Sequence, residues 1–393
     1  MASQKVSPVK IAGINVLVLI GLLLTTNLLS FLILEIREHS KYLIQSIADG
    51  LPSISLAEYK NEFHNLSRWE LPNYSDEFRA KQIFDDLKIL KTEYRPYIGW
   101  SRLQAKLDTI TINTEGDRIH TLPHHLPVDA PIVRFFGGST VFGTGARDND
   151  TTPAIFNRLN PYLRVLNHGE ASFLSRQELA RLINLYGQGK SADLVVFYDG
   201  LNDVGVLCRE DTQITGHNRS EEISVRIKQS NSFLHALNGV FLKYTAQLVR
   251  YIKVRILGAP QQKYSCASDP TRAQNVARVL INNWKMARSL VIEQGGRFIA
   301  ILQPVAYYGH PRTEHVFQHL EISALREDYE TVYPIIIEMM EDYDYMHDLT
   351  SAFNGDSFIY IDYGHVSKLG NQIIAQKIDE IYHAARSAET RPQ

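Results

Sequence analysis

Cysteine is scarce in this 393-residue chain, and the two cysteines that are present exclude several classes of protein. Cys208 and Cys266 do not form the closely spaced CxxC pair typical of a zinc site, and two cysteines cannot hold together a small disulfide-rich fold. Two interpretations stay open: a disulfide between them, if the domain lies outside the cytoplasm, or two unpaired thiols.

An excess of charge of one sign is also lacking. The 41 Lys and Arg residues are balanced by 43 Asp and Glu residues, which gives a formal net charge of -2. A protein that binds a polyanion gathers a basic excess on one face, so no nucleic-acid partner is expected.

Motifs for cofactors and metals are missing as well. The glycines from Gly137 to Gly145 form neither a G-x-G-x-x-G pattern nor a G-x-x-x-x-G-K-[ST] loop, which argues against nucleotide binding. His124 and His125 stand in a loop between two prolines, where a histidine pair is more often at the surface than bound to a metal. We therefore expect no metal and no cofactor.

The N-terminal region has one long run without charge, from Ile11 to Leu34. About 20 helical residues span a bilayer, so residues 11–34 are predicted to be a transmembrane helix. Residues 1–10 carry Lys5 and Lys10, which favours a cytoplasmic tail and an extracytoplasmic, for example periplasmic, location for the rest of a single-pass membrane protein. A cleaved signal peptide is the alternative, but its apolar region is shorter and ends in a small-residue cleavage site, and no such site is visible.

Residues 35–130 are interpreted as a stalk and a small α+β accessory segment. The alternating β-branched residues of Thr109–Asn113 predict a strand, and residues 114–117 predict the turn that follows it.

Residues 131–385 alternate between apolar strands and amphipathic helices. We predict helices from Thr151, from a capping box at Ser175 to about Tyr186, and from about Ser367 to Ala385. The five predicted strands are Pro131–Gly137, Leu163–Asn167, Asp193–Tyr198, Arg297–Leu302 and Phe358–Ile361. Continuous apolar strands that alternate with helices indicate an α/β fold with a five-stranded parallel sheet covered on both faces.

Small, polar and catalytic residue types follow these strands. In parallel sheets, ligands bind just beyond the carboxyl ends of the strands. Gly137-Gly138-Ser139 follows the first strand, Asn167-His168-Gly169 ends the second, Gly200-Leu201-Asn202 follows the third, and Asp362-Tyr363-Gly364-His365 follows the fifth. Each motif alone is common by chance, and only the combination at one edge of a sheet indicates a site.

These residue types suit acyl transfer. Ser139 is the candidate nucleophile, His365 the base that takes its proton, and Asp362 the carboxylate that orients the imidazole. The Ser139 N–H, the Gly169 N–H and the Asn202 amide are the candidate donors of an oxyanion hole. His310, after the fourth strand, is a less suitable base because His365 already fits that role.

In these motifs the chain resembles the SGNH or GDSL-type hydrolase superfamily, which is named for Ser, Gly, Asn and His in four successive blocks. Ser139, Gly169, Asn202 and His365 match those four residues, and the similarity covers about residues 131–385. Two departures are visible: the first block reads Gly-Gly-Ser-Thr instead of Gly-Asp-Ser-Leu, and Ser172 stands where a further glycine is common. The resemblance implies a flavodoxin-like three-layer α/β/α fold and either ester or thioester hydrolysis or deacetylation of carbohydrates, without a metal.

The family pattern does not explain an insert at about residues 204–270. Residues 232–256 have apolar residues at helical spacing and basic residues without any acidic residue. Such a helix can cap the active site, which we favour because the insert begins beside Asn202, or it can lie on an anionic membrane surface.

Three functions stay open. The first is a membrane-anchored serine esterase that removes acyl groups, such as acetyl, from a cell-envelope glycan or lipid. The second is an O-acyltransferase with the same triad, and the third is a non-catalytic envelope scaffold or glycan-binding module. The expected partners are the acylated substrate, the membrane and, by analogy, the polysaccharide machinery of the envelope.

Overall fold

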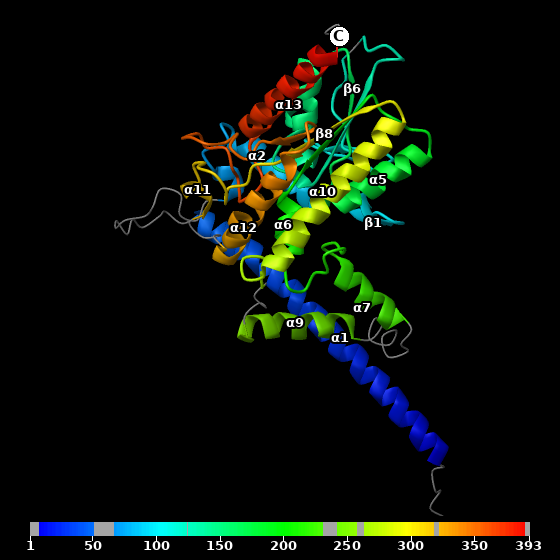
Figure 1. Cartoon of the computed structure of the whole chain (residues 1–393). Coiled ribbons are helices and arrows are strands. Elements are labelled where there is room, and N and C mark those ends of the chain that lie inside the picture. The colour runs from blue at the N-terminus through cyan, green and yellow to red at the C-terminus, as the bar shows by residue number, and fades with distance from the viewer. Residues whose placement is uncertain are drawn as a thin grey trace, which may run out of the picture. The chain divides into compact units, whose positions relative to one another are not determined.

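The computed structural model describes residues 8–50, 67–123, 125–230, 242–257, 263–317 and 322–389 (Figure 1). The chain divides into two units. The larger unit comprises residues 60–218 and 263–393, and the smaller unit comprises residues 1–59 and 219–262. His124 and the first part of the predicted helix 232–256 lie outside the described residues.

A five-stranded parallel sheet forms the centre of the larger unit. Its spatial order is β6 (Arg164–Asn167), β5 (Ile132–Gly137), β7 (Leu194–Asp199), β8 (Arg297–Leu302) and β9 (Met346–Asp348). In order along the chain this is the 2-1-3-4-5 arrangement of flavodoxin-like folds. The predicted fold class is therefore confirmed, with strands β5 to β8 close to their predicted positions.

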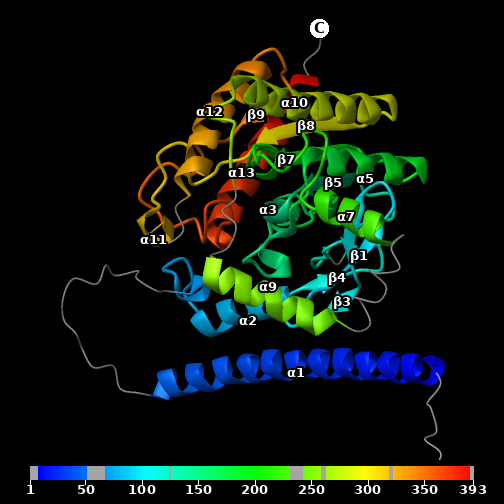
Figure 2. The ribbon, with the colours of Figure 1, turned by 90° about the horizontal axis from the view of Figure 1, so that it is seen from below.

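Helices cover both faces of this sheet. Helices α5 (Ser175–Gly187), α10 (Pro270–Glu293) and α12 (Ser323–Met340) lie on one face, and α10 runs beside both α5 and β8 (Figure 2). Helices α4 (Thr152–Leu159) and α13 (Lys368–Glu389) lie on the other face. Alternate strand residues point to opposite faces of the sheet. Phe197 therefore packs against the layer of α5, α10 and α12, and Tyr198 packs against the layer of α4 and α13. Two short helices directly follow strands: α3 (Ser139–Phe142) follows β5, and α6 (Leu201–Leu207) follows β7. Two more, η2 (Asp148–Asp150) and α11 (Glu314–Phe317), lie in loops.

The prediction of the fifth strand was wrong. Residues 359–361 are buried but do not join the sheet, because their backbone pairs with the chain just after them: Ile361 N–H donates to His365 O at 2.9 Å, and Ser367 N–H donates to Ile359 O at 2.9 Å. The fifth strand is β9, only three residues long, which has no apolar run to reveal it. The segment with Asp362 and His365 is therefore a buried loop beside the sheet.

The predicted capping box at Ser175 was also wrong, although helix α5 begins where expected. The residue before the helix is Leu174, and the Ser175 hydroxyl donates to Asp203 Oδ1 at 2.6 Å instead of capping the helix. The unpaired groups at a helix N-terminus are N–H donors, and the Ser175 oxygen already accepts from Asn283 Nδ2 at 2.9 Å. The bonds to Asp203 and Asn283 therefore determine the orientation of the serine.

Residues 67–130 belong to the larger unit. They form η1 (Arg68–Glu70), α2 (Glu77–Ile89), the hairpin β1 (Thr92–Arg95)–β2 (Gly99–Arg102) and the pair β3 (Ala105–Lys106)–β4 (Thr111–Ile112). Strand β4 confirms the predicted strand at 109–113. A bridge from Arg118 to Asn167 joins this segment to the end of β6.

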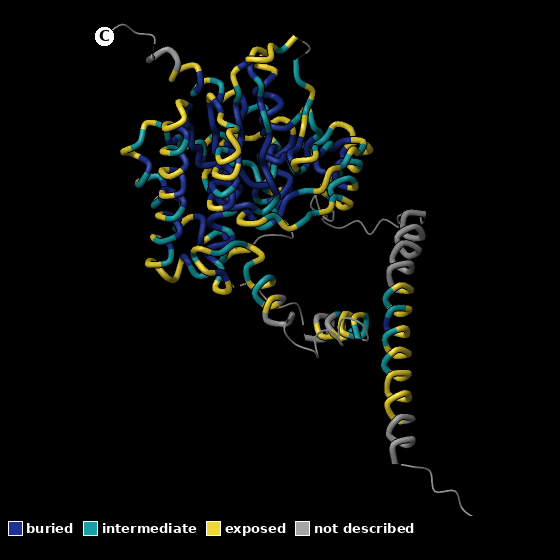
Figure 3. Tube along the Cα trace, turned by 90° about the vertical axis from the view of Figure 1, so that its right-hand side faces the viewer, coloured by how far each residue is buried: buried dark blue, intermediate teal, exposed yellow. Residues whose placement is uncertain are grey.

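The smaller unit contains three described helices, α1 (Pro8–Gly50), α7 (Ser220–Ser230) and α9 (Lys243–Leu257). The part of α1 from Asn15 to Ile36 is long and apolar enough to cross a membrane, and its side chains are mostly exposed. Figure 3 shows this contrast: buried residues fill the larger unit, whereas α1 is exposed along most of its described length.

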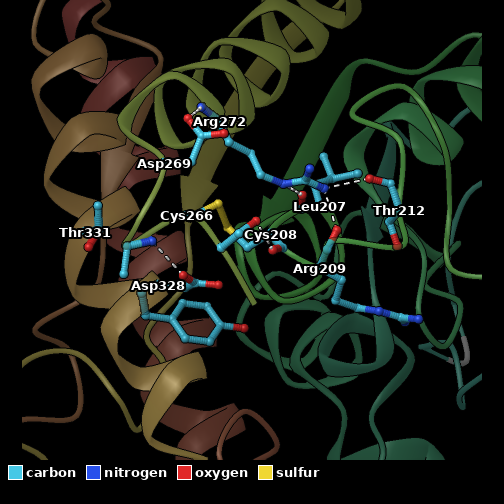
Figure 4. The surroundings of a disulfide bond; sticks show 12 residues. Leu207, Cys208, Arg209, Thr212, Cys266, Asp269, Arg272, Asp328 and Thr331 are labelled. Atoms are coloured by element: carbon cyan, nitrogen blue, oxygen red, sulfur yellow. Dashed lines mark hydrogen bonds between the residues drawn. A yellow bond between two sulfur atoms is a disulfide. The ribbon is translucent and has the colours of Figure 1, made fainter. Parts of the chain in front are cut away.

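A disulfide joins Cys208 and Cys266, and both side chains are fully buried. Arg272 reinforces this connection, because its guanidinium donates to the carbonyl oxygens of Leu207, Arg209 and Thr212 (Figure 4). Of the two interpretations of the cysteines, the disulfide is the one observed. It lies at the base of the insert, where the chain leaves and re-enters the larger unit.

Candidate active site

Ser139 lies at the carboxyl end of β5, at the start of helix α3. Strands β5 and β7 are neighbours at the point where the strand order reverses, and parallel sheets bind ligands outside this switch point. Glycine is required just before the serine, because a Cβ atom on Gly138 would lie 2.2 Å from Asn202 Nδ2. The sequence thus packs the backbone before Ser139 directly on the Asn202 amide.

The structure brings Ser139, His365 and Asp362 together in hydrogen-bonded order. His365 Nε2 lies 2.6 Å from Ser139 Oγ, and His365 Nδ1 lies 2.7 Å from Asp362 Oδ2. With the Nδ1 proton held by the carboxylate, Nε2 is free to accept the serine proton. The Asp362 side chain is 3% exposed, whereas the His365 side chain is 18% exposed, so the imidazole reaches solvent and the carboxylate does not.

Three donors besides His365 Nδ1 surround the Asp362 carboxylate. Its Oδ1 accepts the backbone N–H groups of Gly364 at 2.9 Å and His365 at 2.8 Å, and its Oδ2 lies 3.2 Å from Arg68 Nη2. Burial alone raises the pKa of a carboxyl, but His365, Arg68 and the backbone donor together hold the pKa of Asp362 well below its usual range. Asp362 is therefore ionised beside His365.

The Asn202 side chain lies beside Ser139 because of the turn that precedes α6. Gly200, at the end of β7, has φ +112, a conformation that favours glycine. The Asn202 Nδ2 group donates to Phe173 O at 2.8 Å. An amide has a second N–H, so Asn202 retains one donor for a ligand at this position.

Gly169 and Ser172 differ in what their N–H groups do. The Gly169 N–H donates to Asn167 Oδ1 at 2.9 Å and is therefore already engaged. Ser172 has φ +62, an uncommon conformation for a residue other than glycine, and its N–H has no acceptor among the described residues. It directly precedes Phe173, the residue that binds the Asn202 amide. The absence of the glycine common at this position in the family was the only sequence signal that pointed to Ser172.

Three buried carboxyl groups lie behind this edge of the sheet. Asp203 accepts from Ser175 Oγ, Asp199 accepts from Trp284 Nε1 at 2.6 Å, and Glu178 is fully buried beside Asp199. Burial raises the pKa of Asp199 to about 7 and that of Asp203 to about 6, and it holds the pKa of Glu178 well above its usual range. These groups support the turn that carries Asn202.

Two other histidines do not resemble a catalytic base. His168 is buried, with Nδ1 2.7 Å from Asp117 Oδ1 and Nε2 2.9 Å from Arg134 Nη1, so both ring nitrogens are occupied. His310 is exposed in a loop where its backbone N–H donates to Asn354 Oδ1 at 2.8 Å.

Arg68 is the residue of this site that sequence reasoning missed. It belongs to η1, in the segment interpreted as a stalk and accessory region, and it contacts the one carboxylate of the candidate triad. An arginine in a polar segment far from the motif gives no local signal, so only the fold reveals it.

Neither a family model nor a curated protein matches the sequence. Among solved structures, the chain is similar to a member of the lipolytic protein G-D-S-L family from Veillonella parvula, with 10% identity, 64% of this chain and 98% of that chain covered, and a TM-score of 0.37. It is also similar to the acetyl xylan esterase AlAXEase, with 14% identity, 63% and 98% coverage and a TM-score of 0.35.

A third similar structure is a GDSL-like lipase from Bacteroides thetaiotaomicron, with 15% identity, 66% of this chain and 91% of that chain covered, and a TM-score of 0.33. Similarities this remote carry no functional assignment. The function has to be argued from the residues of the site itself.

Proposed function

We propose that this protein is a serine ester hydrolase of the SGNH type, anchored to a membrane by α1. The observation that carries the proposal is the chain of hydrogen bonds from Ser139 Oγ to His365 Nε2 and from His365 Nδ1 to Asp362. A buried carboxylate, an imidazole and a serine in this order are the arrangement that activates a hydroxyl as nucleophile.

The proposed reaction has two steps. Ser139 Oγ attacks the carbonyl carbon of an ester while its proton passes to His365 Nε2, and the collapse of the tetrahedral intermediate gives that proton to the leaving alcohol. Water then attacks the acyl-serine, loses a proton to His365, and releases the carboxylic acid and the free serine. Asp362 stabilises the imidazolium in both steps without taking the proton.

We propose the Ser139 N–H, the Asn202 amide and the Ser172 N–H as the donors that stabilise the oxyanion. The sequence pointed to Gly169 as the third donor, and that N–H would serve only after it leaves Asn167. The Ser172 N–H has no competing acceptor among the described residues, which supports its choice.

The location and substrate class are also part of the proposal. The apolar helix supports a membrane anchor, and the buried disulfide supports an oxidising compartment such as the periplasm. An enzyme held there meets the acylated glycans and lipids of the envelope. An alcohol that replaces water in the second step would make the same site an O-acyltransferase.

The test is hydrolysis of nitrophenyl acetate by the full chain in detergent. Ser139→Ala and His365→Ala are each expected to reduce kcat on the order of 10⁴-fold or more. Matched controls are Ser289→Ala and His310→Ala, which change an exposed serine and an exposed histidine outside the site. Equal loss in the controls, or wild-type turnover no faster than that of folded Ser139→Ala, would refute the hydrolase proposal.

A further inference from the structure

Within the smaller unit, the side chain of Asn27 from α1 caps the start of α9. Asn27 Oδ1 accepts the backbone N–H of Tyr244 at 2.8 Å and that of Thr245 at 3.3 Å. These are the second and third residues of α9, whose N–H groups have no acceptor within their own helix. An Asn side chain normally caps the helix that follows it, whereas here it caps a helix far along the chain.

Ser30 and Phe31 extend this contact by one turn of α1. Ser30 is 4% exposed, and its Oγ lies 2.8 Å from Thr26 O and 3.3 Å from Thr245 Oγ1. The rings of Phe31 and Tyr244 are 4.9 Å apart. Asn27, Ser30 and Phe31 are spaced three and four residues apart, so they form one face of α1.

The hydroxyl groups of the apolar run, that of Ser30 included, have acceptors within α1. Thr25 and Thr26 donate to the carbonyl oxygens of Gly21 and Leu22 in their own helix. A polar group without a partner is costly in a hydrocarbon environment, so the Asn27 side chain is expected to make a contact between helices. A helix that serves only as a membrane anchor does not need an asparagine at this position. The contact with α9 accounts for the presence of Asn27.

The position of Asn27 places this contact at the edge of a bilayer. Asn27 lies seven residues before Leu34, where the uncharged run ends, which corresponds to about 10 Å along a helix. Amphipathic helices that bind membranes lie about 5–10 Å deep, at the boundary of headgroups and acyl chains. A helix whose first turn contacts Asn27 therefore meets the bilayer at this boundary.

The composition of α9 suits this location. It has the basic residues Lys243, Arg250, Lys253 and Arg255 and no acidic residue. Among its described side chains, Val249 and Ile252 are 46% and 44% exposed although they are apolar. Exposed apolar groups suit acyl chains, and basic groups suit anionic lipid headgroups.

We propose that α9 is an interfacial helix that lies on an anionic bilayer and is docked on the anchor through Asn27. This inference rests on the proposed membrane anchorage of α1 and is independent of the esterase chemistry. The insert returns to the larger unit at the Cys208–Cys266 disulfide, so the catalytic domain has two covalent connections to the membrane: the segment after α1 and the insert.

Cross-linking of the full chain in vesicles tests the docking. The native cysteines form a disulfide, so Ser30→Cys with Thr245→Cys introduces the only free thiols. We expect this pair to cross-link under mild oxidation, and the pair Leu29→Cys with Thr245→Cys to remain reduced, because Leu29 is exposed on another face. Adding Asn27→Leu to the first pair should reduce its cross-link. Equal cross-linking of both pairs, or of neither, would overturn the docking.

Fluorescence quenching tests the membrane contact. The full chain carries an environment-sensitive dye at Ile252→Cys, or at Gln247→Cys as the polar exposed control, in vesicles of phosphatidylcholine and phosphatidylglycerol. Nitroxide-labelled lipid should quench the dye at 252, and aqueous iodide should quench the dye at 247. Shielding of position 252 from both quenchers would indicate a protein cap, and quenching by iodide alone would indicate a free helix; either result overturns the inference.

A dye at Leu24→Cys separates this inference from the anchor on which it rests. Leu24 is exposed on α1 within the apolar run, so lipid-borne nitroxide should quench it. Quenching at 24 without quenching at 252 would overturn only the role of α9. Absence of quenching at 24 would overturn the anchor itself, whatever the esterase assay gives.

Discussion

Arg68 Nη2 lies 3.2 Å from Asp362 Oδ2, so a residue from the segment before the sheet shares the carboxylate that orients His365. The Arg68 side chain is 48% exposed, and solvent weakens such an ion pair to about 0.2–1 kcal/mol. Asp362 also keeps its two backbone donors when the arginine is absent. The arginine is therefore a positioning residue whose effect should be small.

The first prediction compares two substitutions at this contact. Arg68→Gln should reduce kcat no more than about fivefold, the factor that corresponds to 1 kcal/mol, and should leave KM unchanged. Asp362→Asn should reduce kcat on the order of 10⁴-fold, because the amide no longer selects the productive imidazole tautomer. Steady-state kinetics on a soluble ester measure both, with Arg79→Gln as the control for loss of an exposed ion pair. A loss in Arg68→Gln as large as that in Asp362→Asn would contradict this division of roles.

A second prediction concerns the oxyanion donors. Asn202→Ala should reduce kcat by about 10²–10³-fold, the usual cost of removing one such donor. Ser172 is proposed to act through its N–H, so Ser172→Gly should retain activity, and glycine adopts φ +62 without strain. Ser172→Val should lose activity and stability, because a β-branched residue is disfavoured at positive φ. Equal activity of the glycine and valine variants would argue against the Ser172 N–H as a donor.

The sequence predicted the sheet well where strands were long and apolar and failed where they were short. Strands β5, β7 and β8 are recognisable because both of their faces are buried. Strand β9 has three residues and no such pattern, whereas the apolar run at 358–361 satisfies its backbone within a loop. Apolar composition reports burial, and it does not report which backbone groups pair.

The same limit applies to the site. Ser139, Asn202, Asp362 and His365 are recognisable because each stands in a short motif. Arg68 and Asn27 act through partners that are distant in sequence, Asp362 and α9 respectively, so no local pattern marks them. The role of an N–H group such as that of Ser172 depends on backbone conformation and on competing acceptors, which side-chain types do not encode.

A third prediction follows from the buried acids. A carboxyl group whose pKa is higher in the folded state binds more protons there, so the free energy of unfolding falls as pH rises between the two pKa values. For Asp199 that window runs from its ordinary value of 3.8 to about 7. Stability contributed by Asp199 is therefore complete below about pH 4 and is lost as pH rises toward 7.

Glu178→Gln should flatten this dependence, because it removes a buried acid beside Asp199. We expect the variant to be more stable than the wild type at pH 8 and to differ little at pH 4.5. Thermal unfolding followed by tryptophan fluorescence at both pH values measures this, with Glu338→Gln on α12 as the exposed control. A gain that is equal at both pH values would show that the effect is not due to ionisation.

A fourth prediction concerns the disulfide at the base of the insert. Cys208 and Cys266 are 58 residues apart, and the entropy of closing a loop of that length corresponds to about 4 kcal/mol of stability. The double variant Cys208→Ala/Cys266→Ala should therefore unfold at a markedly lower temperature. Neither cysteine contacts Ser139, His365 or Asp362 in the structure, so kcat on a soluble ester should stay within about twofold of the wild type below the unfolding transition.

Reduction of the wild-type protein provides the control for lost packing, because it breaks the bond and keeps both sulfur atoms. Both side chains are fully buried, so a reductant should act only when the region opens, and the loss of stability should develop slowly under native conditions. The reduced protein should then unfold at a temperature between those of the wild type and the double variant. Rapid reduction without any change in the unfolding temperature would mean that the disulfide does not hold the base of the insert closed.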